Sequence, residues 1–389
     1  MESKQHFDTH LAFALDNQQI VQQRTHQAQQ QLQGTDSVVG EHYAHLNIAK
    51  QRAEALKFKS IENLERLLID FEYAFTRRNG KVVWCENETD VINEFKKINQ
   101  KNKLKWNVCS SDALVNELNV NEFVVDNELN KINSTQQLDI YTAAFITADT
   151  GAVVITEQPV INNKNINLLL TTIDSIIPKL TDVDLFLPLL STFKQQQLIQ
   201  HQINIVFGKA EKSAGENILF IIDNGRSKIL EQVEQRKTLY CINCGACNSV
   251  CPVSNVVGNE AFSSAVAGPI AMVKNQFQLG LHNHKHLSYA STMCGKCSQV
   301  CPLNIDIHNQ LIHNRKHIVQ KHLTSKSDNI ALFFWKSNML KRSKMEKGGA
   351  TLKNFMLKQF FKKQWGDQRE FPIVHSKSFN QLWRDNHKK

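Results

Sequence analysis

The chain has 389 residues, of which 41% are hydrophobic and 8% aromatic. This length allows two or three domains, and the composition is ordinary for a globular protein. The first ten residues are polar and lack the apolar stretch of a secretory signal. No apolar run approaches the about 20 residues of a membrane-spanning helix. We therefore expect neither a secreted nor a membrane-spanning protein, but a soluble chain in the cytoplasm.

Residues 1–58 are predicted to form an N-terminal helical arm. Residues 1–40 are polar, with nine Gln between Gln18 and Gln33, so we expect a helical or frayed segment that contributes nothing to the core. From about residue 41 to residue 78, apolar residues recur at helical spacing, and Asn79-Gly80 supplies the end of the last helix.

Residues 59–230 are predicted to form an α/β domain, because short strand-like runs alternate with helical patterns. Some runs are apolar throughout, as at residues 218–222, which favours a sheet covered by helices on both faces. The predicted strands are residues 81–85, 121–125, 143–148, 152–155, 167–172, 184–188 and 217–222. The predicted helices are residues 89–99, 111–118, 175–180 and 189–201.

Seven of the nine cysteines crowd into residues 241–301. In a reducing compartment such thiols are more often metal ligands than disulfides. The first run is C-x2-C-x2-C-x3-C-P, which is typical of iron–sulfur proteins. It comprises Cys241, Cys244, Cys247 and Cys251, followed by Pro252. Gly245 lets the backbone approach the inorganic sulfides, whose hydrogen bonds tune the reduction potential.

The second run lacks its first cysteine, and Ser291 stands at that position. It comprises Cys294, Cys297 and Cys301, followed by Pro302. In paired runs the fourth cysteine typically binds the other cluster. We therefore assign Cys241, Cys244, Cys247 and Cys301 to cluster 1, and Cys251, Cys294 and Cys297 to cluster 2. The last ligand of cluster 2 stays open between Ser291, a nearby histidine, a partner side chain and water; a three-iron cluster would need none.

Zinc is the alternative metal for these cysteines. Structural zinc takes four ligands, usually as two pairs separated by a loop, whereas here three cysteines share consecutive x2 spacing and a proline follows each run. We therefore expect two iron–sulfur clusters of the [4Fe-4S] type. The long interval between Cys251 and Cys294, with a helical run at residues 261–279, favours an α-helical ferredoxin domain over residues 231–324.

Residues 325–389 are predicted to form a basic, helical C-terminal extension. From His313 onward the chain has 18 Lys and Arg against 5 Asp and Glu, with aromatic runs at residues 333–335 and 360–361. Such a segment could pack on its own domain, dock a partner or lie on a membrane surface. No nucleic-acid recognition motif occurs in it, so we expect no nucleic-acid partner.

The cysteine region resembles that of the lactate utilization protein B (LutB-like) family. Serine at position 291 is also the family's pattern. Weaker similarity covers residues 41–90 and 140–160, where Asp149-Thr150-Gly151 resembles a family Glu-Thr-Gly segment. The closest matches are residues 242–247, 250–253, 268–270 and 289–297, with the junction at residues 223–230 and the closing segment at residues 377–383.

This resemblance implies a LUD domain, similar in fold to sugar-phosphate isomerases and CoA transferases, ahead of the two clusters. It also implies a complex of A, B and C subunits that oxidises L-lactate to pyruvate. In it this chain would pass electrons, beside a cysteine-rich A-type subunit and a C-type LUD subunit. Between Asp112 and Tyr141 the chain is shorter than the family pattern, so a pocket built by that stretch would be absent or altered.

A different class of function stays open. The α/β domain could itself act on a phosphorylated or CoA-linked substrate through the Asp149-Thr150-Gly151 turn, with the clusters in a redox or structural role. No catalytic residue can be assigned from the sequence, and the purely structural interpretation of Thr150-Gly151 is a strand-linking turn. We also expect solvated side chains for His282, His284 and His286, and buried structural thiols for Cys85 and Cys109.

Overall fold

The computed structural model describes residues 2–101, 104–134, 136–156, 160–199, 202–209, 214–262, 267–342, 349–365 and 370–387. The chain divides into two compact units, Met1–Lys321 and His322–Lys389. None of the helices in the described ranges combines the length and apolar character needed to span a bilayer. The finer boundaries predicted at residues 58, 230 and 324 stay predictions.

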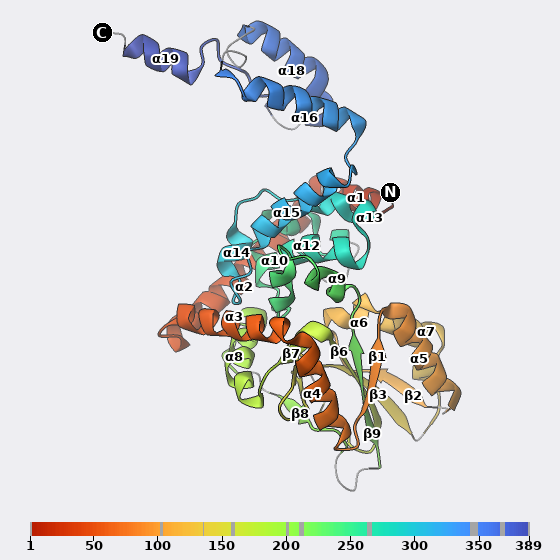
Figure 1. Ribbon diagram of the computed structural model, residues 1–389. Coiled ribbons are helices and arrows are strands. Elements are labelled where there is room, and N and C mark those ends of the chain that lie inside the picture. Colours follow the sequence, from red (N-terminus) through yellow and green to blue (C-terminus); the bar gives the residue numbers. More distant parts are fainter. Residues whose placement is uncertain are drawn as a thin grey trace. The chain divides into compact units, whose positions relative to one another are not determined.

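A five-stranded sheet lies in the lower part of the first unit, below the helices α10 (Ala246–Ser249), α12 (Pro269–Gln278) and α15 (Ile307–Gln320) in the view of Figure 1. All its neighbouring strands are parallel, with Leu169 opposite Leu219 and Ile140 opposite Leu168. The carboxyl ends of the five strands therefore lie along one edge of the sheet. In spatial order the strands are β1 (Lys81–Cys85), β9 (Glu216–Ile222), β6 (Ile166–Thr172), β3 (Gln137–Thr142) and β2 (Lys105–Val108).

Alternate residues of these strands fill two separate cores. Phe220 packs with Phe95 in a core formed with α5, α6 and α7, whereas Leu219 packs with Phe71 in a core formed with α4. Because both faces are covered, the strands are rich in buried apolar residues, and the predicted α/β class is confirmed. The four helices are α4 (Leu64–Thr76), α5 (Glu88–Lys101), α6 (Ala113–Glu117) and α7 (Val120–Asp126).

A smaller mixed sheet lies beside α4. Its strand β4 is antiparallel to β5 and parallel to β7. Ile146 faces the α4 core, and on the opposite face the Phe145 ring lies 5.5 Å from that of Phe186 on α8 (Val183–Gln195). In spatial order the strands are β7 (Ile176–Ile177), β4 (Phe145–Thr147), β5 (Ala152–Ile155) and β8 (Asn204–Val206).

Three predicted elements were wrong. Residues 121–125 form α7 and not a strand, because Val120, Phe123 and Val124 are buried at helical spacing. Residues 184–188 begin α8, which carries Pro188 inside the helix. Residues 175–180 contain β7 and the start of a 3-10 helix instead of an α-helix. The helix predicted at residues 189–201 ends earlier, at Gln195, and residues 200–201 lie outside the described residues.

Strands β2, β3 and β8 were missed. Strand β3 carries Asp139, a residue that is rare in strands. In the fold Asp139 is buried and accepts hydrogen bonds from the side chains of Asn107, at 2.8 Å, and Asn165, at 2.6 Å. These hydrogen bonds compensate for the loss of water around the carboxylate, which therefore can be buried in the sheet.

Residues 226–320 contain short helices joined by loops and no strand among the residues that the structure describes, and residues 263–266 of the predicted 261–279 run lie outside that description. The α-helices are α9 (Arg226–Leu230), α10 (Ala246–Ser249), α11 (Pro252–Val257), α12 (Pro269–Gln278), α13 (Leu281–His284), α14 (Lys296–Val300) and α15 (Ile307–Gln320). The 3-10 helices of the unit are Leu129–Lys131, Ile173–Ser175, Leu180–Asp182, Arg236–Tyr240, Glu260–Phe262 and Lys285–Ser288.

The N-terminal helices α1 (Glu2–Asp16), α2 (Gln18–His42) and α3 (Leu46–Glu62) belong to this unit. The expected helices are present, but the expectation that residues 1–40 contribute nothing to the core was wrong. Phe7 is buried with its ring 6.2 Å from that of Phe262, and Arg24 donates to the Val256 carbonyl at 3.1 Å. A few apolar and basic side chains thus attach a polar sequence to the helical region.

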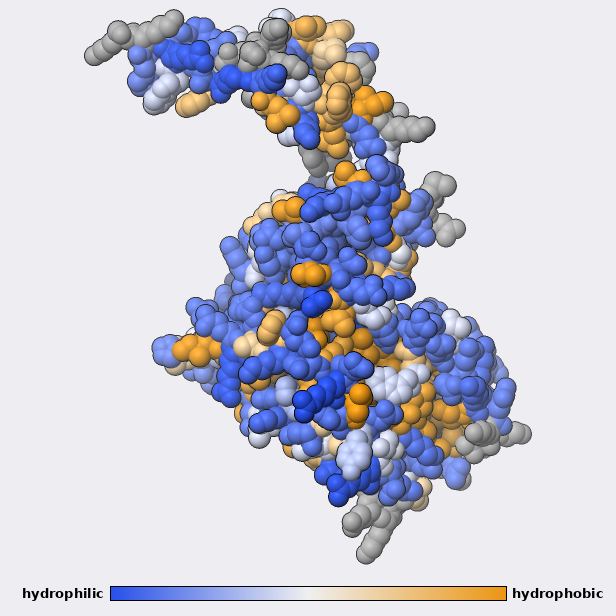
Figure 2. Space-filling view, in the orientation of Figure 1, coloured by the Kyte–Doolittle hydropathy of each residue, from blue (hydrophilic) through white to orange (hydrophobic). Residues whose placement is uncertain are grey.

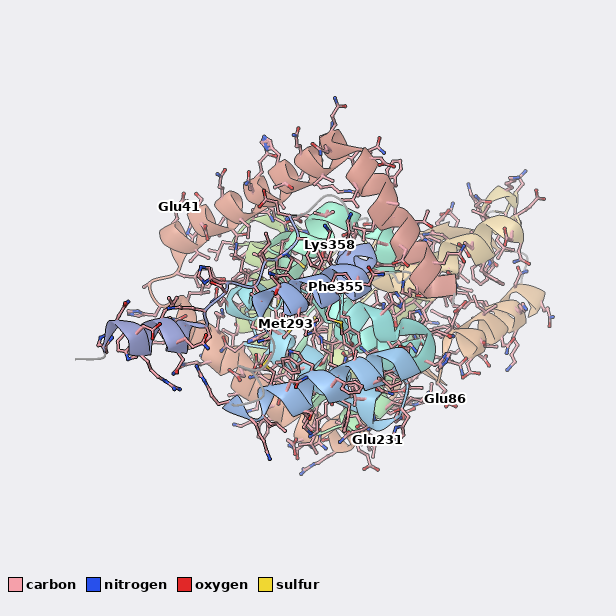
Figure 3. The ribbon with its side chains drawn as sticks, turned by 90° about the horizontal axis from the view of Figure 1, so that it is seen from above. Glu41, Glu86, Glu231, Met293, Phe355 and Lys358 are labelled. Atoms are coloured by element: carbon pink, nitrogen blue, oxygen red, sulfur yellow. The ribbon has the colours of Figure 1, made fainter. Side chains whose placement is uncertain are left out.

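The second unit contains α16 (Lys326–Met339), α18 (Ala350–Trp365) and α19 (Phe379–Asn386). Figure 2 shows hydrophobic residues at its surface, and Phe333, Trp335 and Phe355 are each more than 60% exposed. Figure 3 labels Phe355 and Lys358, which lie about one turn apart on α18. The side chains of residues 360–361 lie outside the described ones.

Candidate iron–sulfur site

The first cysteine loop has a backbone that few residues adopt readily. Asn243 and Gly245 have positive φ values of 53° and 77°, and Gly245 precedes α10. The Asn243 N–H donates to the Cys241 sulfur over 3.4 Å. Glycine and asparagine tolerate the left-handed conformation best, so the sequence favours this loop before any metal binds.

The second loop repeats this geometry step by step. Met293 and Gly295 have φ values of 56° and 77°, and Gly295 precedes α14. The Met293 N–H donates to the Ser291 hydroxyl at 3.2 Å, the counterpart of the bond to Cys241. Ser291 therefore occupies the structural position of the missing cysteine. Methionine has no special tolerance for positive φ, so the loop keeps this shape at a cost; Met293 is labelled in Figure 3.

Four cysteines border one cavity of about 190 Å³ next to the first loop. Cys241, Cys244 and Cys247 come from the loop, and Cys301 comes from the end of α14, which packs against α10. Burial raises the pKa of the Cys247 thiol well above its usual range, and charges on the other three cysteines raise it further. Burial likewise raises the pKa of Cys301 to about 11.

The remaining three cysteines are also neighbours. Burial raises the pKa of the Cys297 thiol, with additional contributions from Cys251 and Cys294. Cys294 is exposed, and its pKa is lowered, first by the backbone N–H of Lys296 and then by Thr292. The seven thiols therefore fall into the same groups of four and three as the crosswise sequence assignment.

Two buried lysines of α3 test whether the first group suits an anionic cofactor. The Lys50 ammonium donates to the carbonyl of Gln299 at 3.1 Å, and that of Lys57 donates to the carbonyl of Asp174. Burial lowers the pKa of Lys57 to about 8. Neither lysine forms an ion pair within 4.0 Å among the described residues. Buried cations require a compensating charge.

Cysteines of the first group contribute negative charge near both lysines, as the leading contributors for Lys50 and after Asp174 for Lys57. Burial lowers the pKa of both lysines, and against it negative charge on Cys301 and Cys244 raises the pKa of Lys50. Negative charge on Asp174, and then on Cys241, likewise raises the pKa of Lys57. An iron–sulfur cluster with thiolate ligands would supply the missing negative charge. The donor set and its surroundings therefore fit such a cluster, which would give the chain one-electron redox chemistry.

His282 is exposed, as expected, but the expectation of solvated side chains was wrong for His284, which is buried, and for His286. His286 is not solvated: both ring nitrogens are buried without a hydrogen-bond partner, and the ring lies 5.7 Å from that of Phe7. Burial lowers its pKa to about 4. His308, which the sequence analysis missed, lies beside the second loop, where its Nδ1 is 2.7 Å from the Ser298 hydroxyl. A Cβ added to Gly295 would meet the His308 ring at 4.0 Å.

The structure is consistent with the structural roles expected of Cys85, Cys109 and the Asp149-Thr150-Gly151 turn. Burial raises the pKa of Cys85 to about 12 and that of Cys109 to about 11, as for unreactive thiols. The Asp149 carboxylate accepts from the Leu180 N–H at 3.0 Å, and Arg78 donates to the Thr150 carbonyl at 2.6 Å. Gly151 packs against the backbone of α4. These contacts describe a strand-linking turn.

Comparison with known proteins adds the cofactor. Residues 237–305 match the family described as 4Fe-4S dicluster domain. The predicted cofactors, two [4Fe-4S] clusters, are thereby confirmed. Among the described residues no three His, Cys, Asp or Glu side chains meet closely enough to hold a single metal ion.

Curated relatives share one name. Lactate utilization protein B of Oceanobacillus iheyensis is 31% identical over 271 residues, which cover 64% of this chain and 56% of that protein. Lactate utilization protein B 2 of Bacillus mycoides is 24% identical, and lactate utilization protein B of Bacillus cytotoxicus is 25% identical. Both of these alignments cover 87% of this chain and 88% of the relative. This chain is similar to lactate utilization protein B.

The resemblance to lactate utilization protein B that the sequence predicted is thus confirmed. Among solved structures, a DUF162 family protein from Deinococcus radiodurans aligns with 41% of this chain and 98% of its own, at 9% identity and a TM-score of 0.30. That likeness is too low to support an argument, so the fold assignment rests on the strand order and register described above.

Proposed function

We propose that this chain is an iron–sulfur electron-transfer subunit of a lactate-utilization system, and that it serves the oxidation of L-lactate to pyruvate. One observation carries the proposal: two cysteine loops of equal backbone geometry lie together, and the cysteine that ends each run lies near the loop of the other. The names of the relatives supply the substrate. A cytoplasmic location is part of the same proposal.

The ligand assignment belongs to this proposal. Cluster 1 would be held by Cys241, Cys244, Cys247 and Cys301, which border one cavity. Cluster 2 would be held by Cys251, Cys294 and Cys297. Burial raises the pKa of Cys247 in the first set and of Cys297 in the second, and charge on neighbouring cysteines raises both further, which supports both sets. Their crossed ligands Cys251 and Cys301 would keep the two clusters close together within a helical ferredoxin domain.

The electron balance suits two clusters. Oxidation of lactate to pyruvate converts a secondary alcohol to a ketone and releases two protons and two electrons. Each [4Fe-4S] cluster accepts one electron, so a pair can store both electrons from one substrate molecule. The protons leave to solvent or to a base at the dehydrogenating site, and the electrons pass to an acceptor outside this chain.

Partners are part of the proposal. We expect an A-type cysteine-rich subunit and a C-type LUD subunit, and no nucleic acid. The exposed aromatic residues of the second unit, with its excess of basic residues, would suit docking to a partner or contact with a membrane surface.

The rival function, an α/β enzyme for a phosphorylated or CoA-linked substrate, has less support. Its candidate feature, the Asp149-Thr150-Gly151 turn, uses its polar groups in hydrogen bonds to the surrounding fold.

The proposal is tested by anaerobic purification followed by iron, sulfide and zinc analysis. We expect about eight irons per chain, as two four-iron clusters require, and visible absorption that bleaches on reduction. Adding L-lactate with the partner subunits should bleach the same absorption, whereas D-lactate should not. Stoichiometric zinc without visible absorption would contradict the cluster proposal. Clusters that bleach with dithionite but never with lactate and partners would contradict the lactate proposal.

A further inference from the structure

A polar cavity lies at the carboxyl edge of the parallel sheet. Thr142 ends β3, Thr172 ends β6, Asp112 lies just beyond β2, and Arg226 lies just beyond β9; all four line the cavity. In open α/β sheets this edge is where ligands bind, because the loops that leave the strands converge there. The sequence analysis placed no site here.

The walls of the cavity carry cations, hydroxyl groups and two carboxylates. The carboxylates of Asp112 and Glu117 pair with Lys194 and Arg226, respectively. Lys57 is 1% exposed, and its recorded hydrogen bond goes to a backbone carbonyl. Lys194 on α8 lies 3.1 Å from Asp112 and is 31% exposed. Ser175 and Thr156 add hydroxyl groups to the lining. An ammonium group together with hydroxyl donors is suited to a carboxylate.

Arg226 has a structural role in this wall, because its guanidinium group is already paired and is not available to a ligand. Its guanidinium lies 3.1 Å from Glu117 and 3.0 Å from Asp174, and all three side chains are buried. It also donates to the Asp223 carbonyl at 3.1 Å. With its donors engaged on several sides, Arg226 fixes the loops after β6 and β9, and Lys57 remains as the buried cation without a carboxylate in direct contact.

The size of the cavity limits the ligand. Its volume of about 40 Å³ accommodates roughly three water molecules, each of which needs on the order of 10–15 Å³ on this measure. Three waters occupy about the space of one carboxylate group, so a small acid would place its carboxylate inside the cavity and its remaining atoms at the rim. A CoA thioester or a sugar phosphate would lie largely outside the cavity, which again disfavours the rival function.

The cavity shares a wall with the proposed site of cluster 1. Ala113, Cys241, Ile242 and Asn243 border both this cavity and the cavity of the four cysteines. A molecule bound at the sheet edge would therefore be separated from cluster 1 by the Cys241 loop alone.

We infer that this cavity binds a small 2-hydroxy or 2-oxo carboxylate, with the Lys57 ammonium neutralising the carboxylate and Lys194 closing the rim. The inference rests on the proposed function for the class of acid. It assigns the substrate site to this chain and makes cluster 1 the cluster adjacent to substrate.

The test uses the full chain with its clusters, titrated anaerobically with pyruvate, then oxalate, then inorganic phosphate. Binding is followed by calorimetry and by the electron paramagnetic resonance (EPR) spectrum of reduced cluster 1. We expect pyruvate and oxalate to bind at millimolar or lower concentration and to change the cluster 1 spectrum. Lys57→Met and Lys194→Gln should each weaken binding about tenfold, or about 1.4 kcal/mol.

The matched control is Lys97→Gln, because Lys97 is likewise a helical lysine paired with one carboxylate, Glu94, but lies outside the cavity. It should leave binding unchanged. Intact, reducible clusters without any pyruvate or oxalate binding would overturn the inference while leaving the electron-transfer proposal in place. Phosphate binding more tightly than pyruvate would overturn the carboxylate class. Equal weakening by Lys97→Gln would show that the effect is not local to the cavity.

Discussion

The two cysteine loops share a backbone and differ in what surrounds it. Both place residues with positive φ at matching steps and begin a short helix after glycine. The first presents Cys241 where the second presents Ser291, and two buried lysines approach only the cysteines of the first group. Cys294 of the second loop is exposed. Equal folds can therefore support two clusters of unequal stability and potential.

The largest expected effect separates the two clusters. Cys241→Ser and Cys251→Ser should each remove about four of the about eight irons, but from different clusters, because crossed ligation assigns these neighbours in sequence to different sites. EPR spectra of the reduced variants measure this. Cys109→Ser is the control and should keep both signals. Loss of the same signal in both variants would contradict the crossed assignment.

A smaller effect is expected from restoring the missing thiol. Ser291→Cys should slow oxidative conversion of cluster 2 to a three-iron form roughly tenfold, the range typical of changes around a metal site. The three-iron signal measured during mild oxidation reports the rate. Ser227→Cys, outside the loops, should change nothing. If His308→Ala accelerates the conversion and Ser291→Cys leaves it unchanged, then His308 is the fourth ligand.

The lysines should affect cluster 1 alone. Lys50→Met removes a buried positive charge near Cys301 and Cys244, so the reduced, more negative cluster loses stabilisation and its potential should fall. A fall of about 60 mV corresponds to a tenfold change in a one-electron equilibrium. Redox titration followed by EPR measures this. Arg52→Met, on the exposed side of α3, is the control; an equal shift of both clusters would argue against a local effect.

The last expected effect is on stability and not on a cluster, and it concerns the support of α1 near the second loop. The folded chain holds His286 neutral, with a pKa of about 4 against an ordinary 6.5. As pH falls from about 6.5 to about 4, the unfolded chain binds the extra proton, so folding stability should fall by about 2 kcal/mol. Urea unfolding across this pH range measures the loss. His286→Phe should remove this part of the pH dependence; an unchanged dependence would show that His286 is not its source.

The sequence predicted what local patterns encode. Strands 218–222 and 152–155 are apolar runs that report burial directly, and cysteine spacing reports the loop that surrounds a cluster. The positions of Lys50 and Lys57 could not be predicted, because their environment comes from cysteines almost two hundred residues away. Strand β3 was missed for a similar reason. Asp139 argues against a strand, and the side-chain amides that donate hydrogen bonds to its carboxylate come from other parts of the chain.

Other errors arose from competition between local propensity and packing. Residues 121–125 contain two valines and a phenylalanine, which favour a strand. In the structure Phe123 and Val124 are buried with Val120 at helical spacing and Val125 is exposed, which is the pattern of α7. In the site, Ser291 was recognised as the missing position, whereas His308 and the sheet-edge cavity had no local signal. Both are assembled from segments that meet only in the folded chain.

In the ligation that we propose, four cysteines hold one cluster and three cysteines hold the other. Mössbauer spectroscopy of protein purified with isotope-enriched iron tests it most directly, because each iron reports its own ligands. We expect about eight irons in two clusters, with one iron of one cluster distinct from the rest in its isomer shift and quadrupole splitting. Eight equivalent thiolate-ligated irons, or iron for one cluster only, would contradict the account.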